Sequence, residues 1–289
     1  MDDGFLQAQG EAIYETTSTW AGLLSAETQL RPLQEAKEGD LTADVDRIIE
    51  KDAERTFMQP CQREALSRVM RSLAVEFKNY AQAMSYVGGF LMLMHDEETS
   101  VAMMRVLNGN PKYIPGYWTT EAIAFATDAY VFLPLLEAHE PEVAKLLKEK
   151  FCIMPETYLQ KWWVALCIQS LPFELGVVYL KHFFEGGYIF LFQFAIALHW
   201  HFKEKLLAAK DHAEVYSILR LERKVLQETP ITEAVFAQAL TYSFPDLDID
   251  KARQTAYDTH LKARIERARQ LAEEDDDLSD FDDEDEDDE

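Results

Sequence analysis

Apolar positions recur at intervals of three and four residues over long parts of the chain, which predicts amphipathic helices. The strongest signal covers residues 62–94, where one stripe is formed by Leu66, Val69, Met70, Leu73 and Phe77. Gly88 and Gly89 interrupt this stretch, which indicates either a close contact between helices or a kink. A shorter helix is predicted at 44–54, after a loop at 35–43.

Proline, glycine and asparagine divide the next part of the chain into further predicted helices. Residues 108–116 read Asn-Gly-Asn-Pro-Lys-Tyr-Ile-Pro-Gly, a composition typical of a loop. The helices expected after it are 119–137, 141–150, 157–170, 174–184 and 187–209. No stretch gives a convincing series of alternating apolar and polar positions, so the pattern indicates an all-α fold.

The two ends of the chain differ from this helical body, which is predicted at 18–210. Residues 1–17 form a polar N-terminal segment, and the Ser/Thr cluster at 16–19 can cap a helix that starts near Trp20. Residues 211–270 are more charged and predict a helical extension.

Composition supports this division. The chain has 289 residues, of which 48% are apolar, and its 11 glycines and 10 prolines favour long helices over turn-rich β structure. The net charge of −24 is uneven, because residues 273–289 hold 14 acidic side chains and no basic one. We therefore predict a disordered acidic tail at 271–289, suited to a basic partner. The acidic balance indicates no nucleic-acid partner.

The sequence contains no pattern typical of secretion or of a membrane anchor. Its three cysteines, Cys61, Cys152 and Cys167, are widely spaced, so we expect small core residues in a reducing cytoplasmic setting. The longest uncharged run, 186–202, has 17 residues and falls just short of a bilayer span. It is predicted to be a buried core helix, rich in aromatic residues that pack in the core.

Three polar side chains carry the most informative chemistry. Asp52 and Arg55 are three residues apart on a predicted helix, where taken alone they would form an ordinary ion pair. Gln82 taken alone would be a tolerated polar residue on an apolar helix. An arginine and a glutamine together, however, are the side chains that complete the active site of a slow GTPase.

The segments around these residues resemble the two signature motifs of TBC-domain Rab GTPase-activating proteins. Residues 49–57 read Ile-x-x-Asp-x-x-Arg-Thr-Phe, and residues 80–84, which follow at a suitable distance, read Tyr-x-Gln-x-Met. Further segments resemble the family over 18–210: Trp20 with Ala21-Gly22-Leu23-Leu24, His95-Asp96-Glu97-Glu98, Trp162 with Leu171-Pro172, and Phe183-Phe184-Glu185-Gly186.

This resemblance implies a two-lobed, all-helical domain that binds the GTP form of a Rab-family small GTPase and regulates vesicle trafficking. Arg55 would be the arginine finger and Gln82 the glutamine finger, both supplied in trans. Asp52 would orient Arg55 through a charge-assisted hydrogen bond. Thr56 would support the site, while Tyr80 and Met84 would hold the glutamine helix and line the contact surface. GTP and Mg²⁺ would belong to the partner, so the chain itself would be an activator with no cofactor of its own. The partner would also recruit this chain to endomembranes.

Three departures from the family pattern leave other functions open. Thr16 stands where the family usually has an arginine, and Tyr179-Leu180-Lys181 lacks a common Trp-Asp pair. Ala81 and Ala83 replace the more usual Cys and Gly beside Gln82. One alternative is a catalytically silent adaptor that keeps the fold and binds a GTPase. Another is a helical scaffold whose acidic tail binds basic partners.

The remaining candidate chemistry is sparse. Ser279 lies in Asp-Leu-Ser-Asp-Phe-Asp, a context that suits phosphorylation by an acid-directed kinase. His199 and His201 do not share a helix face, so we expect residues at the rim of the core and no metal site. Because no glycine-rich phosphate loop is present, the chain is not expected to bind nucleotide by itself.

Overall fold

The computed structural model describes the backbone of residues 3–119 and 122–271, with side chains from residue 10 onward. Helices and turns make up these ranges, in which no strand occurs, and this confirms the predicted all-α fold. Of the acidic tail predicted at 271–289, Leu271 is helical, and residues 272–289 with Ser279 lie outside the described residues.

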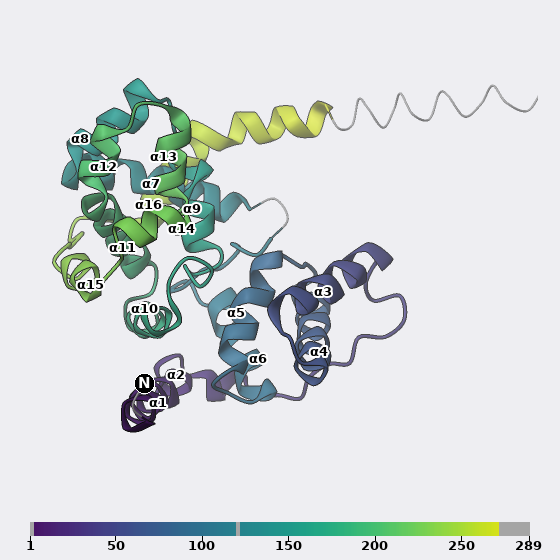
Figure 1. Cartoon of the computed structure of the whole chain (residues 1–289). Helices are drawn as coiled ribbons and strands as arrows, with labels where there is room; N and C mark the ends of the chain where they lie inside the picture. Colours follow the sequence, from purple (N-terminus) through teal and green to yellow (C-terminus); the bar gives the residue numbers. More distant parts are fainter. Residues whose placement is uncertain (1–2, 120–121, 272–289) are drawn as a thin grey trace, which may run out of the picture.

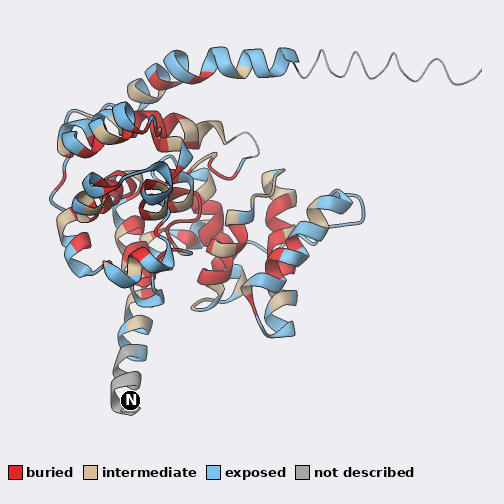
Figure 2. Cartoon of the chain, turned by 45° about the horizontal axis from the view of Figure 1, so that its top comes forward, coloured by how far each residue is buried: buried red, intermediate tan, exposed pale blue. Residues whose placement is uncertain are grey.

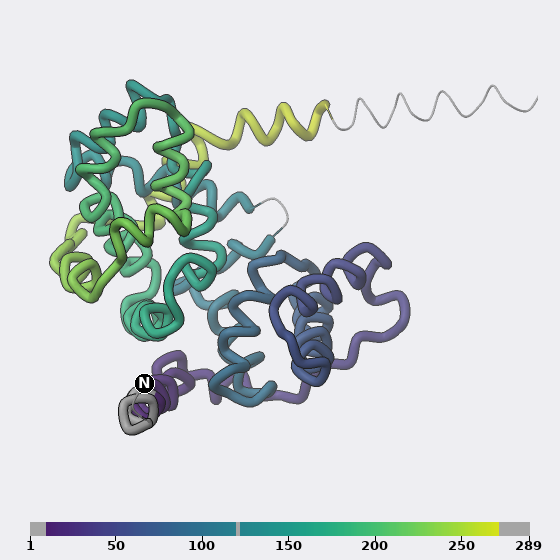
Figure 3. The backbone as a smooth tube through the Cα atoms, in the orientation of Figure 1, coloured from purple at the N-terminus to yellow at the C-terminus, as the bar shows by residue number. Residues whose placement is uncertain are grey.

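The helices form two lobes (Figures 1 and 3). The N-terminal lobe consists of α3 (Ala43–Thr56), α4 (Pro60–Phe77), α5 (Gln82–Met92) and α6 (Glu97–Gly109). The C-terminal lobe consists of α7 (Ile123–His139), α8 (Pro141–Lys145), α9 (Leu159–Trp163), α10 (Phe173–Gly186), α11 (Tyr188–His201) and α12 (Lys203–Ala208). The C-terminal helices that follow this lobe are α13 (His212–Leu219), α14 (Arg223–Glu228), α15 (Glu233–Ala239) and α16 (Ile249–Ala256). Ahead of both come α1 (Asp3–Ser18), α2 (Trp20–Leu23) and the 3-10 helix η1 (Ala26–Gln29).

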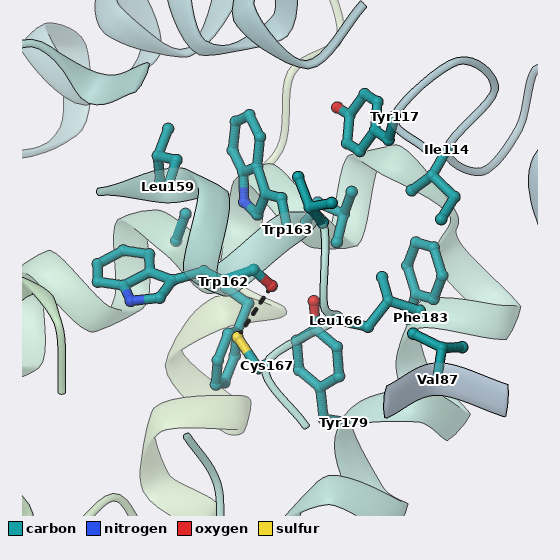
Figure 4. Close-up of a cluster of buried hydrophobic side chains, with 14 of the residues drawn as sticks. Val87, Ile114, Tyr117, Leu159, Trp162, Trp163, Leu166, Cys167, Tyr179 and Phe183 are labelled. Atoms are coloured by element: carbon teal, nitrogen blue, oxygen red, sulfur yellow. Dashed lines mark hydrogen bonds between the residues drawn. The ribbon is translucent and has the colours of Figure 1, made fainter. Parts of the chain in front are cut away.

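Helix α10 joins the two lobes into one core. Its Phe173 ring lies 5.2 Å from the ring of Phe90 on α5, and its Phe184 ring lies 5.3 Å from the ring of Trp20 on α2. Figure 4 shows Val87 of α5 in the same cluster as Tyr179 and Phe183 of α10, beside the tryptophans of α9. The buried faces of the helices accordingly point toward one another, while the last helical segment is largely exposed (Figure 2).

The predicted helical stretch at 62–94 is divided in two, which the periodicity did not indicate. Helix α4 ends at Phe77, because Lys78 adopts a left-handed conformation with φ of 55°. The side chain of Asn79 donates a hydrogen bond to the carbonyl of Trp118, which holds the connection against the following loop. Helix α5 then begins at Gln82, so this residue occupies a first turn and not a helix interior.

The Gly88–Gly89 pair lies inside the uninterrupted helix α5 and makes a close contact with neighbouring helices. A Cβ atom at Gly88 would lie 2.5 Å from the Met70 methyl group of α4. A Cβ atom at Gly89 would lie 2.8 Å from the Thr56 methyl group of α3. Both distances are shorter than Cβ contacts in proteins allow, so the two glycines set how near α5 approaches α3 and α4.

The predicted Ser/Thr cap before Trp20 is wrong. Thr19 precedes α2, but its side chain makes no capping bond. The hydroxyls of this cluster instead donate to carbonyls three or four residues earlier, as Thr16 does to Ala12 at 2.9 Å and Ser18 to Glu15 at 2.9 Å. These bonds lie at the end of α1. The sequence predicted only a mixed polar segment in this part of the chain, whereas the structure has a helix there.

Several other predicted boundaries shift at residues with positive φ. Helix α7 starts at Ile123, not 119, because Ala122 has φ of 48°. The helix expected at 157–170 is limited to η3 (Pro155–Thr157) and α9, since Leu166 and Cys167 are left-handed. Two other predicted helices are divided without a residue of positive φ at the division. The helix expected at 141–150 is present as α8 followed by the π-helical turn η2 (Leu146–Lys150). The helix expected at 187–209 is divided between α11 and α12.

The buried character of residues 186–202 is confirmed, but that of two cysteines is not. Most of α11 is buried, including Phe190, Phe192 and Phe194, and no helix in the described ranges is long and apolar enough to cross a membrane. Cys167 is buried, whereas Cys61 and Cys152 are exposed. Cys61 lies in the first turn of α4, and Cys152 lies in a left-handed turn, so neither reaches the core.

Residues 211–270 are helical as predicted, and they pack closely on the C-terminal lobe. Helix α15 contacts α11, while α16 and the π-helical turn η4 (Tyr257–Leu261) contact α7. The guanidinium of Arg253 on α16 makes two hydrogen bonds of 2.7 Å to the buried carboxylate of Asp128 on α7. The hydroxyl of Tyr117 donates to the same carboxylate at 2.6 Å.

Candidate functional site

Helix α3 presents Arg55 at its C-terminal end. The helix begins after Thr42, whose hydroxyl accepts a hydrogen bond from the Val45 amide, and Ile49 and Ala53 bury one face. Arg55 lies in the last turn, where a positive charge is favourable beside unpaired carbonyls. Its side chain is 63% exposed, so the guanidinium is free to reach a partner.

Asp52, one turn earlier on α3, is the centre of the site. Its side chain is 2% exposed, and both carboxylate oxygens accept hydrogen bonds. Oδ1 lies 3.5 Å from Nη1 of Arg55 and 3.3 Å from Nε2 of Gln82. Oδ2 accepts a bond of 2.9 Å from the hydroxyl of Tyr80. One buried carboxylate thus brings together the three polar side chains that the motifs predicted.

Burial raises the pKa of Tyr80, and the neighbouring Asp52 carboxylate adds to the shift, so the hydroxyl that donates to Asp52 stays protonated well above neutral pH. A tyrosine that keeps its proton can stabilise Asp52 over the whole neutral pH range. Its position in the connection between α4 and α5 therefore ties the glutamine segment to α3.

Gln82 is the first residue of α5 and is exposed. Besides Asp52, its Nε2 contacts the hydroxyl of Tyr86, one turn further along α5, at 3.2 Å. Met84 is fully buried, and its sulfur accepts a bond of 3.4 Å from the Ala81 amide. Met84 can therefore hold α5 on the core, but it does not line a contact surface, contrary to the expectation.

Thr56 contacts both α3 and α5. Its hydroxyl donates to the Asp52 carbonyl at 2.7 Å, while its methyl group faces Gly89 of α5. After α3, Arg63 donates to the carbonyls of Phe57 at 2.6 Å and Met58 at 3.0 Å. These bonds fix the chain beyond Arg55.

Sequence reasoning missed three residues of this site: Tyr86, Arg63 and Met58. Tyr86 is four residues after Gln82, a spacing that could have indicated the contact between them. Arg63 bonds to main-chain carbonyls, which leave no pattern in the sequence. Met58, with 85% of its surface exposed, follows the arginine motif closely as an unpartnered apolar residue.

A hollow of about 310 Å³ opens beside Gln82 at the junction of the lobes. It is lined by Ala81, which precedes α5, by Gln82, Ala83 and Tyr86 of α5, and from the C-terminal lobe by Gln160, Lys161, Val164, Ala165 and Gln169. Among the described residues, no group of three His, Cys, Asp or Glu side chains could hold a metal ion. Arg55 and Gln82 are both exposed, so their polar ends are accessible from solvent.

The two-lobed all-α fold and the site formed by Asp52, Arg55 and Gln82 together define a class of helical domain. Comparison with known proteins identifies that class. Residues 13–207 match the Rab-GTPase-TBC domain family, and the chain belongs to that family.

Two solved structures share the fold. A Chlamydomonas flagellar RabGAP TBC domain aligns with a TM-score of 0.64 and 18% identity, covering 84% of this chain and 86% of that one. The TBC domain of Skywalker/TBC1D24 from Drosophila melanogaster aligns with a TM-score of 0.57 and 13% identity, covering 85% of each chain.

Similar proteins of known sequence include growth hormone-regulated TBC protein 1-A of Danio rerio, 29% identical over 184 residues. That match covers 59% of this chain and 51% of the relative. Human growth hormone-regulated TBC protein 1 is 24% identical over 225 residues, covering 72% of this chain and 66% of the relative. The chain therefore matches about half to two thirds of the length of these two relatives.

Proposed function

We propose that this chain accelerates GTP hydrolysis by a Rab-family small GTPase, and that Arg55 and Gln82 complete the partner's active site. The single observation that best supports the proposal is the shared contact of both side chains with Oδ1 of the buried Asp52, at 3.5 and 3.3 Å. Asp52 contacts one terminal nitrogen of each side chain, and both side chains are exposed, so the remaining polar atoms of the guanidinium and the amide can reach a second protein.

Arg55 would stabilise negative charge. During hydrolysis, the water oxygen forms a bond to the γ-phosphorus, while the bond to the bridging oxygen breaks and its electron pair leaves with GDP. A guanidinium is always charged and binds oxygens with a planar fork, so it can offset charge that develops on the bridging and γ-phosphate oxygens. An arginine supplied in trans is worth on the order of 10³ to 10⁵ in rate, as the Ras example shows.

Gln82 would position the attacking water. Orientation of the nucleophile is a large part of phosphoryl-transfer catalysis, because little covalent chemistry is required of the protein. GTP and Mg²⁺ would be held by the GTPase. The partner would be bound in its GTP form and would bring this chain to endomembranes, where Rab proteins control vesicle trafficking.

The test is phosphate release from a panel of GTP-loaded Rab proteins. The wild type should stimulate at least one member, whereas Arg55→Ala should lose about 10³-fold or more of that stimulation. Gln82→Ala should lose a large part of it as well. The matched control is Arg47→Ala, because Arg47 lies on the same helix, is 60% exposed and pairs with Asp44 three residues earlier.

Stimulation that survives both Arg55→Ala and Gln82→Ala would contradict the two-finger mechanism. Two other outcomes would favour the alternative functions. If the wild type binds a Rab protein without stimulating it, the chain is a catalytically silent adaptor. If deletion of 273–289 abolishes partner binding while Arg55→Ala has no effect, the chain is a scaffold that acts through its acidic tail.

A further inference from the structure

The amide of Gln82 is held in one orientation by two acceptors. The same terminal atom of its side chain lies 3.3 Å from Oδ1 of Asp52 and 3.2 Å from the hydroxyl oxygen of Tyr86. A carboxylate only accepts hydrogen bonds, so the atom that faces Asp52 is the nitrogen and not the oxygen of the amide. The chemistry of Asp52 thus settles the assignment of the two amide ends, which coordinates alone often leave open.

Two partners engage both hydrogens of this NH₂ group. One N–H can donate to Asp52 and the other to Tyr86, so the carbonyl oxygen of Gln82 is directed away from both. Among the hydrogen bonds found within the described residues, none reaches the side-chain oxygen Oε1 of Gln82; the Ser85 hydroxyl donates to the main-chain carbonyl of Gln82 instead. The exposed end of the side chain is therefore an acceptor.

Tyr86 contributes what Asp52 cannot supply alone. The terminal torsion of a glutamine is broad, so one hydrogen bond leaves the amide plane free to turn. Tyr86 is half-buried on α5, one turn beyond Gln82, and lines the same hollow at the lobe junction. Its hydroxyl provides a second fixed point on the helix that carries Gln82.

We infer that Tyr86 is a positioning residue that, together with Asp52, presents the carbonyl oxygen of Gln82 to the attacking water. The inference rests on the proposed function and adds a direction to it: Gln82 accepts a hydrogen bond from the water and does not donate one. The water oxygen then keeps a lone pair for the γ-phosphorus. The water proton goes to the phosphate product, and Tyr86 neither gains nor loses a proton.

The test compares Tyr86→Phe with the wild type in single-turnover GTP hydrolysis by a responsive Rab protein. Loss of one neutral hydrogen bond at this position should lower the maximal rate about tenfold. The concentration of this chain that gives the half-maximal rate should stay within about twofold of the wild-type value. The melting temperature should stay within about 2 °C, because the ring keeps its packing. Tyr216→Phe is the control, since Tyr216 is also half-buried and its hydroxyl contacts Thr157, away from the site.

Two further measurements separate positioning from a general structural effect. In the Gln82→Ala background, Tyr86→Phe should change the rate less than twofold, because Tyr86 acts only through Gln82. In the free protein, ¹⁵N NMR of the Gln82 side-chain amide should show that the chemical shift of one of its two protons changes in Tyr86→Phe.

The outcomes distinguish this inference from the function on which it rests. An unchanged maximal rate in Tyr86→Phe, with Arg55→Ala inactive, would overturn the positioning role and leave the proposed function standing. An equal loss of rate in the Gln82→Ala background, or an unmoved amide signal, would also overturn it. A wild type that stimulates no Rab protein would overturn the proposed function, and the inference with it.

Discussion

Asp52 has one carboxylate and three donors around it, so its charge and its geometry both matter. Replacement by asparagine keeps the size but puts an NH₂ group against Arg55, Tyr80 or Gln82. If Arg55 and Gln82 act as proposed, Asp52→Asn should lower GTPase stimulation by on the order of tenfold or more, because the two side chains lose their common anchor. Phosphate release checks this, with Asp44→Asn as control, since Asp44 forms an exposed pair with Arg47 on the same helix. Equal stimulation by the two variants would show that Asp52 orients nothing.

His199 makes stability depend on pH. It is fully buried in α11, where its Nδ1 bonds to the Ala195 carbonyl at 2.7 Å and its Nε2 to the Tyr158 hydroxyl at 2.9 Å. Burial lowers the pKa of His199 to about 4, against the opposing effect of the bond to Ala195. The unfolded chain therefore takes up a proton more readily, and stability that is present above pH 6.5 is lost as the pH falls toward 4.

The predicted loss from this histidine is about 3 kcal/mol between those two pH values. Chemical denaturation at a series of pH values measures it, and His199→Gln should show a shallower decline because glutamine stays neutral. Burial lowers the pKa of three further histidines, so part of the decline should remain: His95, His182 and His201. A variant with the same pH dependence as the wild type would contradict the assignment.

At the scale of helices, the approach of α5 to α3 depends on Gly89. A methyl group there would lie 2.8 Å from the Thr56 methyl group, next to Arg55. Gly89→Ala should push the helices apart and lower the free energy of unfolding by about 1–3 kcal/mol, as overpacking does. The same displacement moves Gln82 relative to Arg55, so stimulation should fall by more than the folded fraction does.

Gly10→Ala is the control for that substitution. Gly10 lies inside α1 with nothing within 4 Å of an added Cβ, so alanine should be neutral or stabilise the helix by up to about 1 kcal/mol. Thermal unfolding and phosphate release on the same samples separate stability from activity. Gly89→Ala with wild-type stability would mean that the helices adjust without cost.

The sequence predicted the helices and the polar centre of the site for different reasons. Local periodicity identified α4, because one apolar face of it is buried, whereas the proline and glycine residues on either side bounded α10. It could not find the break at Lys78, since the apolar spacing continues across it and the left-handed φ of a lysine has no compositional signal. Motif spacing found Asp52, but the two oxygens that join its three partners exist only after folding.

At the scale of the whole molecule, residues 211–270 are not independent of the lobe that precedes them. The pair of Arg253 and Asp128 ties α16 to α7, and the Asp128 side chain is 1% exposed. The Arg253 guanidinium also lies 5.2 Å from the ring centre of Tyr188 on α11, which places it among three helices. The C-terminal helices are therefore expected to unfold together with the C-terminal lobe.

This coupling predicts a large effect from Arg253→Met. Removing one partner leaves the Asp128 carboxylate buried with, among the side chains that the structure describes, only the Tyr117 hydroxyl as donor, which costs about 3–5 kcal/mol of unfolding free energy. Asp128→Asn in the same chain should recover part of this loss, because no buried charge then remains without a partner.

Arg264→Ala is the control: its side chain is 68% exposed and 4.0 Å from Glu156, so we expect little change. Denaturant unfolding measures all four proteins. A small loss for Arg253→Met, or no recovery in the double variant, would show that the C-terminal helices fold separately from the lobe.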